Sequence, residues 1–214
     1  MTIVSAPRDY RTVVVAASLV AGPLLMTVGD LLHPEERMAA PEQIAILVDD
    51  ASRWYTAHLL LFIGILISIP GLLALSRLTA QRNPVAGYMA RILVLIGVAA
   101  FSAVFVGEML IGRFVLDGGP AGATTLLETT LSGPIVAAVG PAMLAFFIGM
   151  AAFASPLMRG GGTLRWIAAL YSIGALLILI EILSAQVMFS QIGNFLILCA
   201  GAAAARLTLK GPNT

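Results

Sequence analysis

The stretch TAHLLLFIGILISIPGLLALS, residues 56–76, decides the fold class of this chain. It contains no aspartate, glutamate, lysine or arginine. A helix rises 1.5 Å per residue, so about 20 residues cross the roughly 30 Å hydrocarbon core of a bilayer. The length and composition of this stretch therefore predict a membrane-spanning helix.

Five further apolar stretches have a comparable length. The chain of 214 residues is 59% hydrophobic and 11% charged, with a mean hydropathy of +0.99, which exceeds what one soluble core requires. We predict one all-α transmembrane domain, residues 1–214, that forms a bundle of about six helices. The spans are expected near 12–32, 56–76, 89–114, 133–157, 166–185 and 187–205. A short polar break at 184–186 predicts a tight hairpin between the last two.

The distribution of lysine and arginine predicts which way the spans run. Short cytoplasmic loops retain these residues. With six spans, nine of them fall on the side of both termini and three on the other side. We therefore predict cytoplasmic termini in a multi-pass protein of a bacterial inner (plasma) membrane. The nine are Arg8, Arg11, Arg77, Arg82, Arg91, Arg159, Arg165, Arg206 and Lys210, and the three are Arg37, Arg53 and Arg113.

The overall charge argues against one class of partner. The net charge is +1 and the basic residues form no long run, so the chain lacks the positive surface that binds nucleic acid. The expected partners are the lipid bilayer, a small-molecule or lipid ligand, and either a second copy of the chain or a larger membrane complex.

The first outer loop, residues 33–55, is expected to contain a short interfacial helix. Pro41 and Glu42 suit a first helical turn, and apolar residues follow them. Trp54 and Tyr55 are expected at the membrane–water boundary, where aromatic residues are common.

Ionisable residues inside spans are costly and usually functional, and here their depths agree. Measured from the nearest cytoplasmic arginine at 1.5 Å per residue, all five polar candidates lie roughly 22–28 Å away, near the outer rim. They are expected to bind a small solute or a proton: Asp30, His58, Glu108, Glu181 and Gln191. Glu108 and Glu181 are the stronger candidates, because partial desolvation of a carboxyl group favours proton uptake near neutral pH. Asn194 adds an amide slightly deeper.

Structural interpretations compete with this one. Glu108 could pair with Arg113, or Arg113 could form an ordinary i,i+4 ion pair with Asp117 at a helix end. Glu128 belongs to a Gly- and Thr-rich stretch, residues 118–130, and is expected to be a solvated loop carboxylate.

A divalent metal is a second hypothesis for the same rim. Asp30 and His33 are three residues apart and could share a helix face, and His58 could meet them from the second span. Imidazole and carboxylate ligands suit zinc, manganese or non-haem iron. The alternative is that Asp30, His33 and Glu35 form a solvated helix end and His58 anchors its span at the headgroups.

Proline and small residues carry weaker signals. Pro23, Pro70 and the pairs at 133–134 and 140–141 are expected to kink or break the first, second and fourth spans. The similar segments at 22–29 and 133–140 suggest an inverted repeat, although composition alone explains so short a match. Two sets of small residues predict close helix packing: Ala99, Ala103 and Gly107, and Gly201 with Ala205.

Three functions remain open from the sequence, because the usual catalytic and nucleotide-binding motifs are missing from it. The first is a small-solute or ion carrier in which a carboxylate binds a proton as the coupling step. The second is a metal-dependent membrane enzyme that acts on a lipid-like substrate at the outer leaflet. The third is an accessory subunit of a larger membrane complex.

Overall fold

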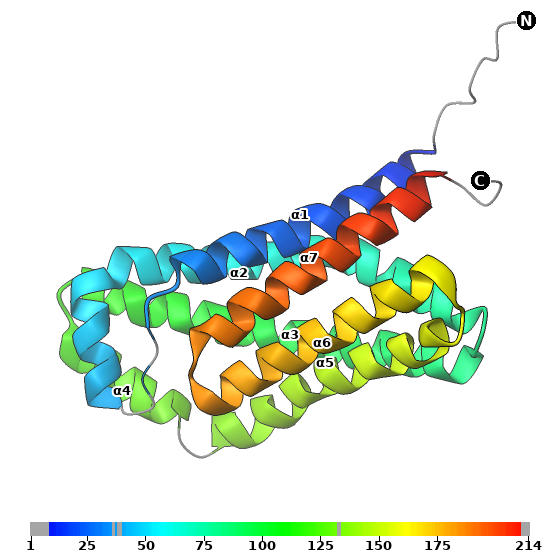
Figure 1. Cartoon of the computed structure of the whole chain (residues 1–214). Helices are drawn as coiled ribbons and strands as arrows, with labels where there is room; N and C mark the ends of the chain where they lie inside the picture. The colour runs from blue at the N-terminus through cyan, green and yellow to red at the C-terminus, as the bar shows by residue number, and fades with distance from the viewer. Residues whose placement is uncertain (1–8, 36, 38–39, 132–133, 211–214) are drawn as a thin grey trace, which may run out of the picture.

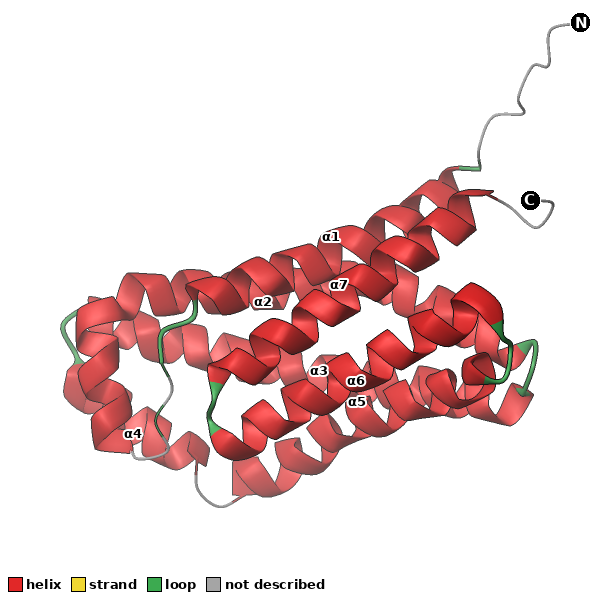
Figure 2. Ribbon diagram, in the orientation of Figure 1, coloured by secondary structure: helices red, strands yellow, loops and turns green. Residues whose placement is uncertain are grey.

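The computed structural model describes residues 9–35, 37, 40–131 and 134–210, and the described part of the chain is helical with no strand (Figures 1 and 2). Six of its helices are long and apolar enough to cross a membrane, as predicted. The helices are α1 (Tyr10–Leu32), α2 (Ala40–Ala80), α3 (Pro84–Leu116), α4 (Pro120–Leu131), α5 (Pro134–Met158), α6 (Gly162–Ser184) and α7 (Val187–Lys210).

The six long helices form a closed ring. Each packs against its neighbour in chain order, α1 to α2, α3, α5, α6 and α7, and α7 packs back against α1. The start of α1 and the end of α7 lie at the same end of the ring (Figure 1), which we call the terminal end. With six helices that alternate in direction, the first begins and the last ends at the same end of the ring.

Large apolar side chains are exposed on the outside of the ring. Every long helix contributes at least one of them, and among the described residues they include Leu24, Ile63, Leu95, Ile148, Leu176 and Phe195. Such an exterior is unfavourable in water but suits hydrocarbon. Together with the six long helices, it is compatible with a multi-pass membrane protein.

The second helix begins earlier than expected, inside the segment predicted to be the first outer loop, residues 33–55. Helix begins at Ala40 and runs directly into the second span, interrupted only by non-helical backbone angles at Asp50 (φ −121°, ψ 23°). The predicted interfacial segment is therefore helical but is a bent extension of α2. Between the two helices, α1 ends at Leu32 and α2 begins at Ala40.

The stretch interpreted as a loop before the fourth span is also helical. It forms α4, on which Glu128 is exposed. Residues 40–50 of α2 together with α4 form what we call the cap, at the end of the ring opposite the chain ends (Figure 1). A small separate core holds the cap to the ring, and its buried members are Ile44, Leu47, Trp54, Ile111 and Ala123.

Local sequence explains where several helices begin and end. The Asn83 side chain accepts a hydrogen bond from the backbone N–H of Ala86 at 3.0 Å, and Pro84 occupies the first turn of α3. The predicted break before the last helix is confirmed, because α6 ends at Ser184 and Ala185 adopts a left-handed conformation with φ 52°. The prolines do not break their helices: α1 continues through Pro23, α2 through Pro70 and α5 through Pro141. Residue 133 lies outside the described residues.

Glycines allow the helices of the ring to approach closely. Gly174 of α6 and Gly193 of α7 face each other, and a Cβ on either would lie 2.6–2.7 Å from the other's carbonyl oxygen. A Cβ on Gly201 would overlap the carbonyl oxygen of Leu19, so α7 and α1 meet backbone to backbone. The prediction of close packing is thus confirmed for Gly201. It is wrong for Gly107 within this chain, where a Cβ would meet nothing within 4 Å.

Candidate functional site

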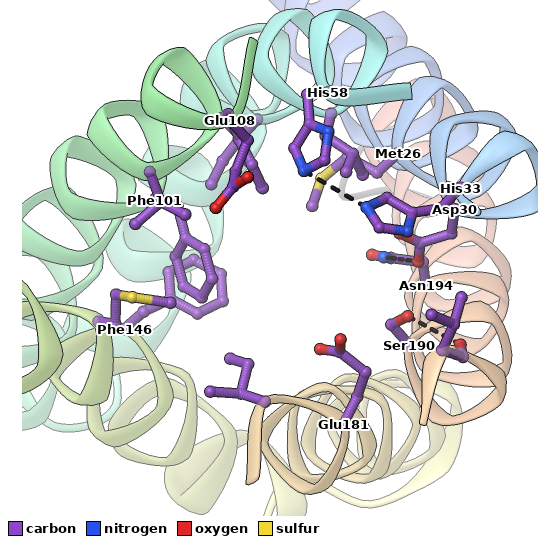
Figure 3. Close-up of a pocket in the computed structure, with 17 residues that line it drawn as sticks. Met26, Asp30, His33, His58, Phe101, Glu108, Phe146, Glu181, Ser190 and Asn194 are labelled. Carbon is purple, nitrogen blue, oxygen red and sulfur yellow. Dashed lines mark hydrogen bonds between the residues drawn. The ribbon is translucent and has the colours of Figure 1, made fainter. Parts of the chain in front are cut away.

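A cavity of about 290 Å³ lies inside the ring, toward the cap. We call it the polar cavity. All six long helices contribute to its wall, including the ionisable residues Asp30, His33, His58, Glu108 and Glu181 (Figure 3). The depths read from the sequence therefore correspond to one cavity, and four of the five predicted solute- or proton-binding residues line it.

Asp30 is tied to the last helix. Its carboxylate oxygen Oδ2 accepts a hydrogen bond of 2.6 Å from Asn194 Nδ2, and its backbone carbonyl accepts one of 3.1 Å from Gln191 Nε2. Asp30 is only 5% exposed and Asn194 only 2%. Gln191, the fifth predicted residue, thus contacts Asp30 from outside the wall of the cavity, whereas Asn194 belongs to that wall.

The two histidines meet each other. Their Nε2 atoms are 3.3 Å apart. Nδ1 of His33 lies 2.7 Å from the Pro34 carbonyl oxygen and Nδ1 of His58 lies 3.0 Å from that of Trp54, so both Nδ1 atoms act as donors. Neutral rings would then face each other lone pair to lone pair. A proton placed between the two Nε2 atoms would satisfy both rings.

Trp54 and Arg53 hold this pair in place. The Trp54 ring lies 4.7 Å from the His33 ring and 4.6 Å from the His58 ring, measured between centroids. Its Nε1 donates to the backbone carbonyl of Glu108 at 3.1 Å, which links α2 to α3. Arg53 Nε donates to the Leu32 carbonyl at 2.6 Å and so satisfies the C-terminal end of α1.

The sequence does not reveal that Trp54 is buried. The residue is expected at the membrane–water boundary, and in the structure its ring is 3% exposed and packs against both imidazoles. This contact is not readable from the sequence, because a tryptophan beside a tyrosine near a span end is the usual pattern of an interfacial belt.

Trp54→Phe is expected to lower the free energy of unfolding by about 1–2 kcal/mol, since it removes one hydrogen bond and part of a buried ring. The measurement is unfolding of the detergent-purified protein with increasing SDS. Trp166→Phe is the matched control, because Trp166 is 71% exposed at the terminal end. Equal effects of the two substitutions would contradict the structural role of Trp54.

Glu108 and Glu181 reach the cavity from opposite parts of its wall. Glu108 comes from α3 and Glu181 from α6, and Figure 3 shows both carboxylates pointing into the central space. Arg113 pairs instead with Asp117, at 3.0 Å, and both side chains are exposed. Of the two pairings considered for Arg113, the ordinary i,i+4 pair is therefore confirmed.

Three phenylalanines complete the wall: Phe101 and Phe105 of α3 and Phe146 of α5. Nearer the terminal end lies a second cavity of about 40 Å³, which we call the apolar cavity. It shares Met26, Ile65, Phe146 and Asn194 with the polar cavity, so the two adjoin. No spacing rule in the sequence identifies these aromatic residues as part of a site, because apolar residues fill every span.

The metal hypothesis gains no geometric support. In the described ranges no three His, Cys, Asp or Glu side chains are arranged so that they could hold a metal ion together. Asp30, His33 and His58 line the same cavity, but the two imidazole nitrogens face each other. A metal site there stays a prediction from ligand type.

Comparisons with known proteins do not add a functional assignment. Searches against protein-family models, curated proteins and solved structures find no match for this chain.

Proposed function

We propose that the protein is a membrane carrier for a small solute or ion, which binds in the polar cavity near the outer face. Proton binding by a cavity carboxylate is the coupling step. The observation that carries this proposal is the convergence of Asp30, Glu108 and Glu181, from three different helices, on one cavity inside an otherwise apolar ring.

The energetic argument favours a binding role for these acids. A carboxylate within a membrane span is costly and persists where it faces a cavity or a partner. A purely structural need would be met by one compensated pair. The three acids lie around a space of about 290 Å³, which is close to the lower end of small-molecule pockets, at about 300 Å³.

The arrangement of the ring favours a carrier over a continuous pore. Between the polar cavity and the terminal end lies a buried apolar core that includes Met150, Phe153, Leu157, Ile167 and Tyr171. On its terminal side a separate hollow of about 560 Å³ opens between α1, α2, α6 and α7. A solute in the polar cavity would therefore need a rearrangement of helices to leave at the other end. Prolines within α1, α2 and α5 are suitable points for such movement, because each removes one backbone hydrogen bond.

Transport into liposomes tests the proposal. The purified protein is reconstituted with the pH-sensitive dye pyranine inside, and proton flux is followed after addition of inorganic cations, organic acids or amines. At least one class is expected to drive a flux that empty liposomes lack and that the double variant Glu108→Gln, Glu181→Gln loses. Asp117→Asn, an acid paired outside the cavity, is expected to retain the flux.

A flux indistinguishable from that of empty liposomes for every class, with protein that elutes as a single species in detergent, would overturn the carrier function. Transport by the double variant at the wild-type rate would overturn it equally, because the cavity carboxylates would then play no part in the coupling step.

A further inference from the structure

We propose that the solute is a protonated amine with a short apolar group, whose ammonium nitrogen sits among the cavity carboxylates and whose apolar group enters the apolar cavity. This inference rests on the carrier function proposed above and specifies the substrate class. Its starting point is that the two cavities adjoin and differ in character.

Charge within the polar cavity favours a cation. The ionisable groups that line it are Asp30 from α1, His33 after the end of α1, His58 from α2, Glu108 from α3 and Glu181 from α6. The wall residues from α5 and α7 are uncharged. Three carboxyl groups from three different helices therefore line one cavity, and any of them that is ionised attracts a positively charged ligand.

Hydrogen-bonding capacity points to a ligand that donates. Asn194 donates an N–H to Asp30. Its Oδ1 is buried in the wall and has no hydrogen-bond partner in the described part of the protein. The Ser190 hydroxyl donates to the Val187 carbonyl at 2.9 Å, so toward a ligand it can only accept a hydrogen bond. An ammonium group offers several N–H donors and no acceptor, which matches a wall of acceptors.

The phenylalanines favour an organic cation over a metal ion. Phe101, Phe105 and Phe146 present aromatic surface, which attracts ammonium groups and packs against their alkyl substituents. Hard inorganic cations instead require a shell of six or more oxygen ligands. The volume of about 290 Å³ is at the small end of ligand pockets and suits an amine of modest size.

The apolar cavity accommodates the apolar group of the proposed ligand. Apart from the residues shared with the polar cavity, its wall includes Leu19, Leu72, Met150, Ile178 and Ile197. An alkyl group bound there leaves water for an apolar surface, and each added methylene is expected to strengthen binding about four-fold until the cavity is filled.

The experiment is isothermal titration calorimetry of the detergent-purified protein with methyl-, ethyl-, propyl- and butylammonium chloride at pH 7. Affinity is expected to rise about four-fold per methylene and then to level off. Propanol, which lacks the charge, is expected to bind at least about 30-fold more weakly than propylammonium, because it cannot form an ion pair with a cavity carboxylate.

Two variants locate the alkyl group. Leu72→Phe and Ile197→Phe each fill the apolar cavity, and are expected to remove the gain with chain length while methylammonium affinity stays within about two-fold of wild type. Ile192→Phe is the matched control on the outside of α7, where Ile192 is 45% exposed. That variant is expected to keep the full chain-length dependence.

An affinity that does not change with chain length in the wild type, or propanol binding as tightly as propylammonium, would overturn the inference. Its failure is distinct from failure of the carrier. If another solute class drives a flux and no ammonium binds, the carrier function is supported and the amine is ruled out as its solute. If ammonium binds with the expected chain-length dependence but no solute drives a flux, the amine site is supported and the carrier function is overturned.

Discussion

Asn194→Leu is expected to lower the free energy of unfolding by about 3 kcal/mol. The substitution removes the 2.6 Å hydrogen bond to the Asp30 carboxylate, in a position where Asn194 is 2% exposed. Hydrogen bonds to charged groups contribute about 1.5–3 kcal/mol, and a buried carboxylate that loses a donor is not rescued by bulk water. The added volume of leucine faces the two cavities, so steric overlap contributes little.

Equilibrium unfolding in mixed detergent micelles with increasing SDS measures this effect. Gln191→Leu is the matched control on the same helix, since Gln191 bonds the backbone carbonyl of the same residue and is half-buried. We expect it to cost about 1 kcal/mol. If the two substitutions cost the same, the bond between Asn194 and Asp30 is not what joins α7 to α1 at this level.

Gly201→Ala is expected to be nearly as damaging, again by about 3 kcal/mol. The new methyl group would overlap the Leu19 carbonyl oxygen, which is a backbone atom and cannot rotate away. Overpacking of this kind costs about 1–3 kcal/mol, and a fixed obstacle lies at the upper end of that range. Displacement of α7 would also disturb Asn194, so reduced ligand binding is expected along with reduced stability.

Gly107→Ala is the control for this substitution, because a Cβ there meets nothing within 4 Å. Alanine is preferred to glycine in a helix by about 1 kcal/mol, so the control variant should be equally or more stable than the wild type. A Gly201→Ala protein whose unfolding midpoint matches that of Gly107→Ala would show that α1 and α7 do not meet as closely as described.

The long helices are predictable from sequence because their signal is composition over about 20 residues, which does not depend on how helices pack. The spans and the break at Ser184 follow from it, with ends that differ by a few residues, except that α2 begins at Ala40 and not near residue 56. The cap is not predictable in the same way. Its α4 is short and rich in glycine and threonine, and it is held by contacts with α2 and α3 that no local pattern encodes.

The sequence predicts the level of the candidate-site residues along their helices, but it does not predict the direction in which each helix turns those residues. Counting residues from the arginines at the terminal end places Asp30, Glu108 and Glu181 at one level, and all three line one cavity. Which way each helix turns its face depends on ring packing. For that reason the sequence predicts a meeting of His33 and His58, 25 residues apart, only as one of two alternatives, and predicts that Gln191 lines the site although it supports it from outside.

Ring closure by α7 also has a consequence for the order in which the fold can form. Because α1 precedes α7 in the chain, Asp30 is synthesised before Asn194 and Gln191, which bond it in the folded ring. The face of α1 that packs against Gly201 likewise waits for α7. The ring can therefore close only after its last helix has been made, so we expect a chain cut before Val187 to lose part of the packing of α1 as well as α7 itself.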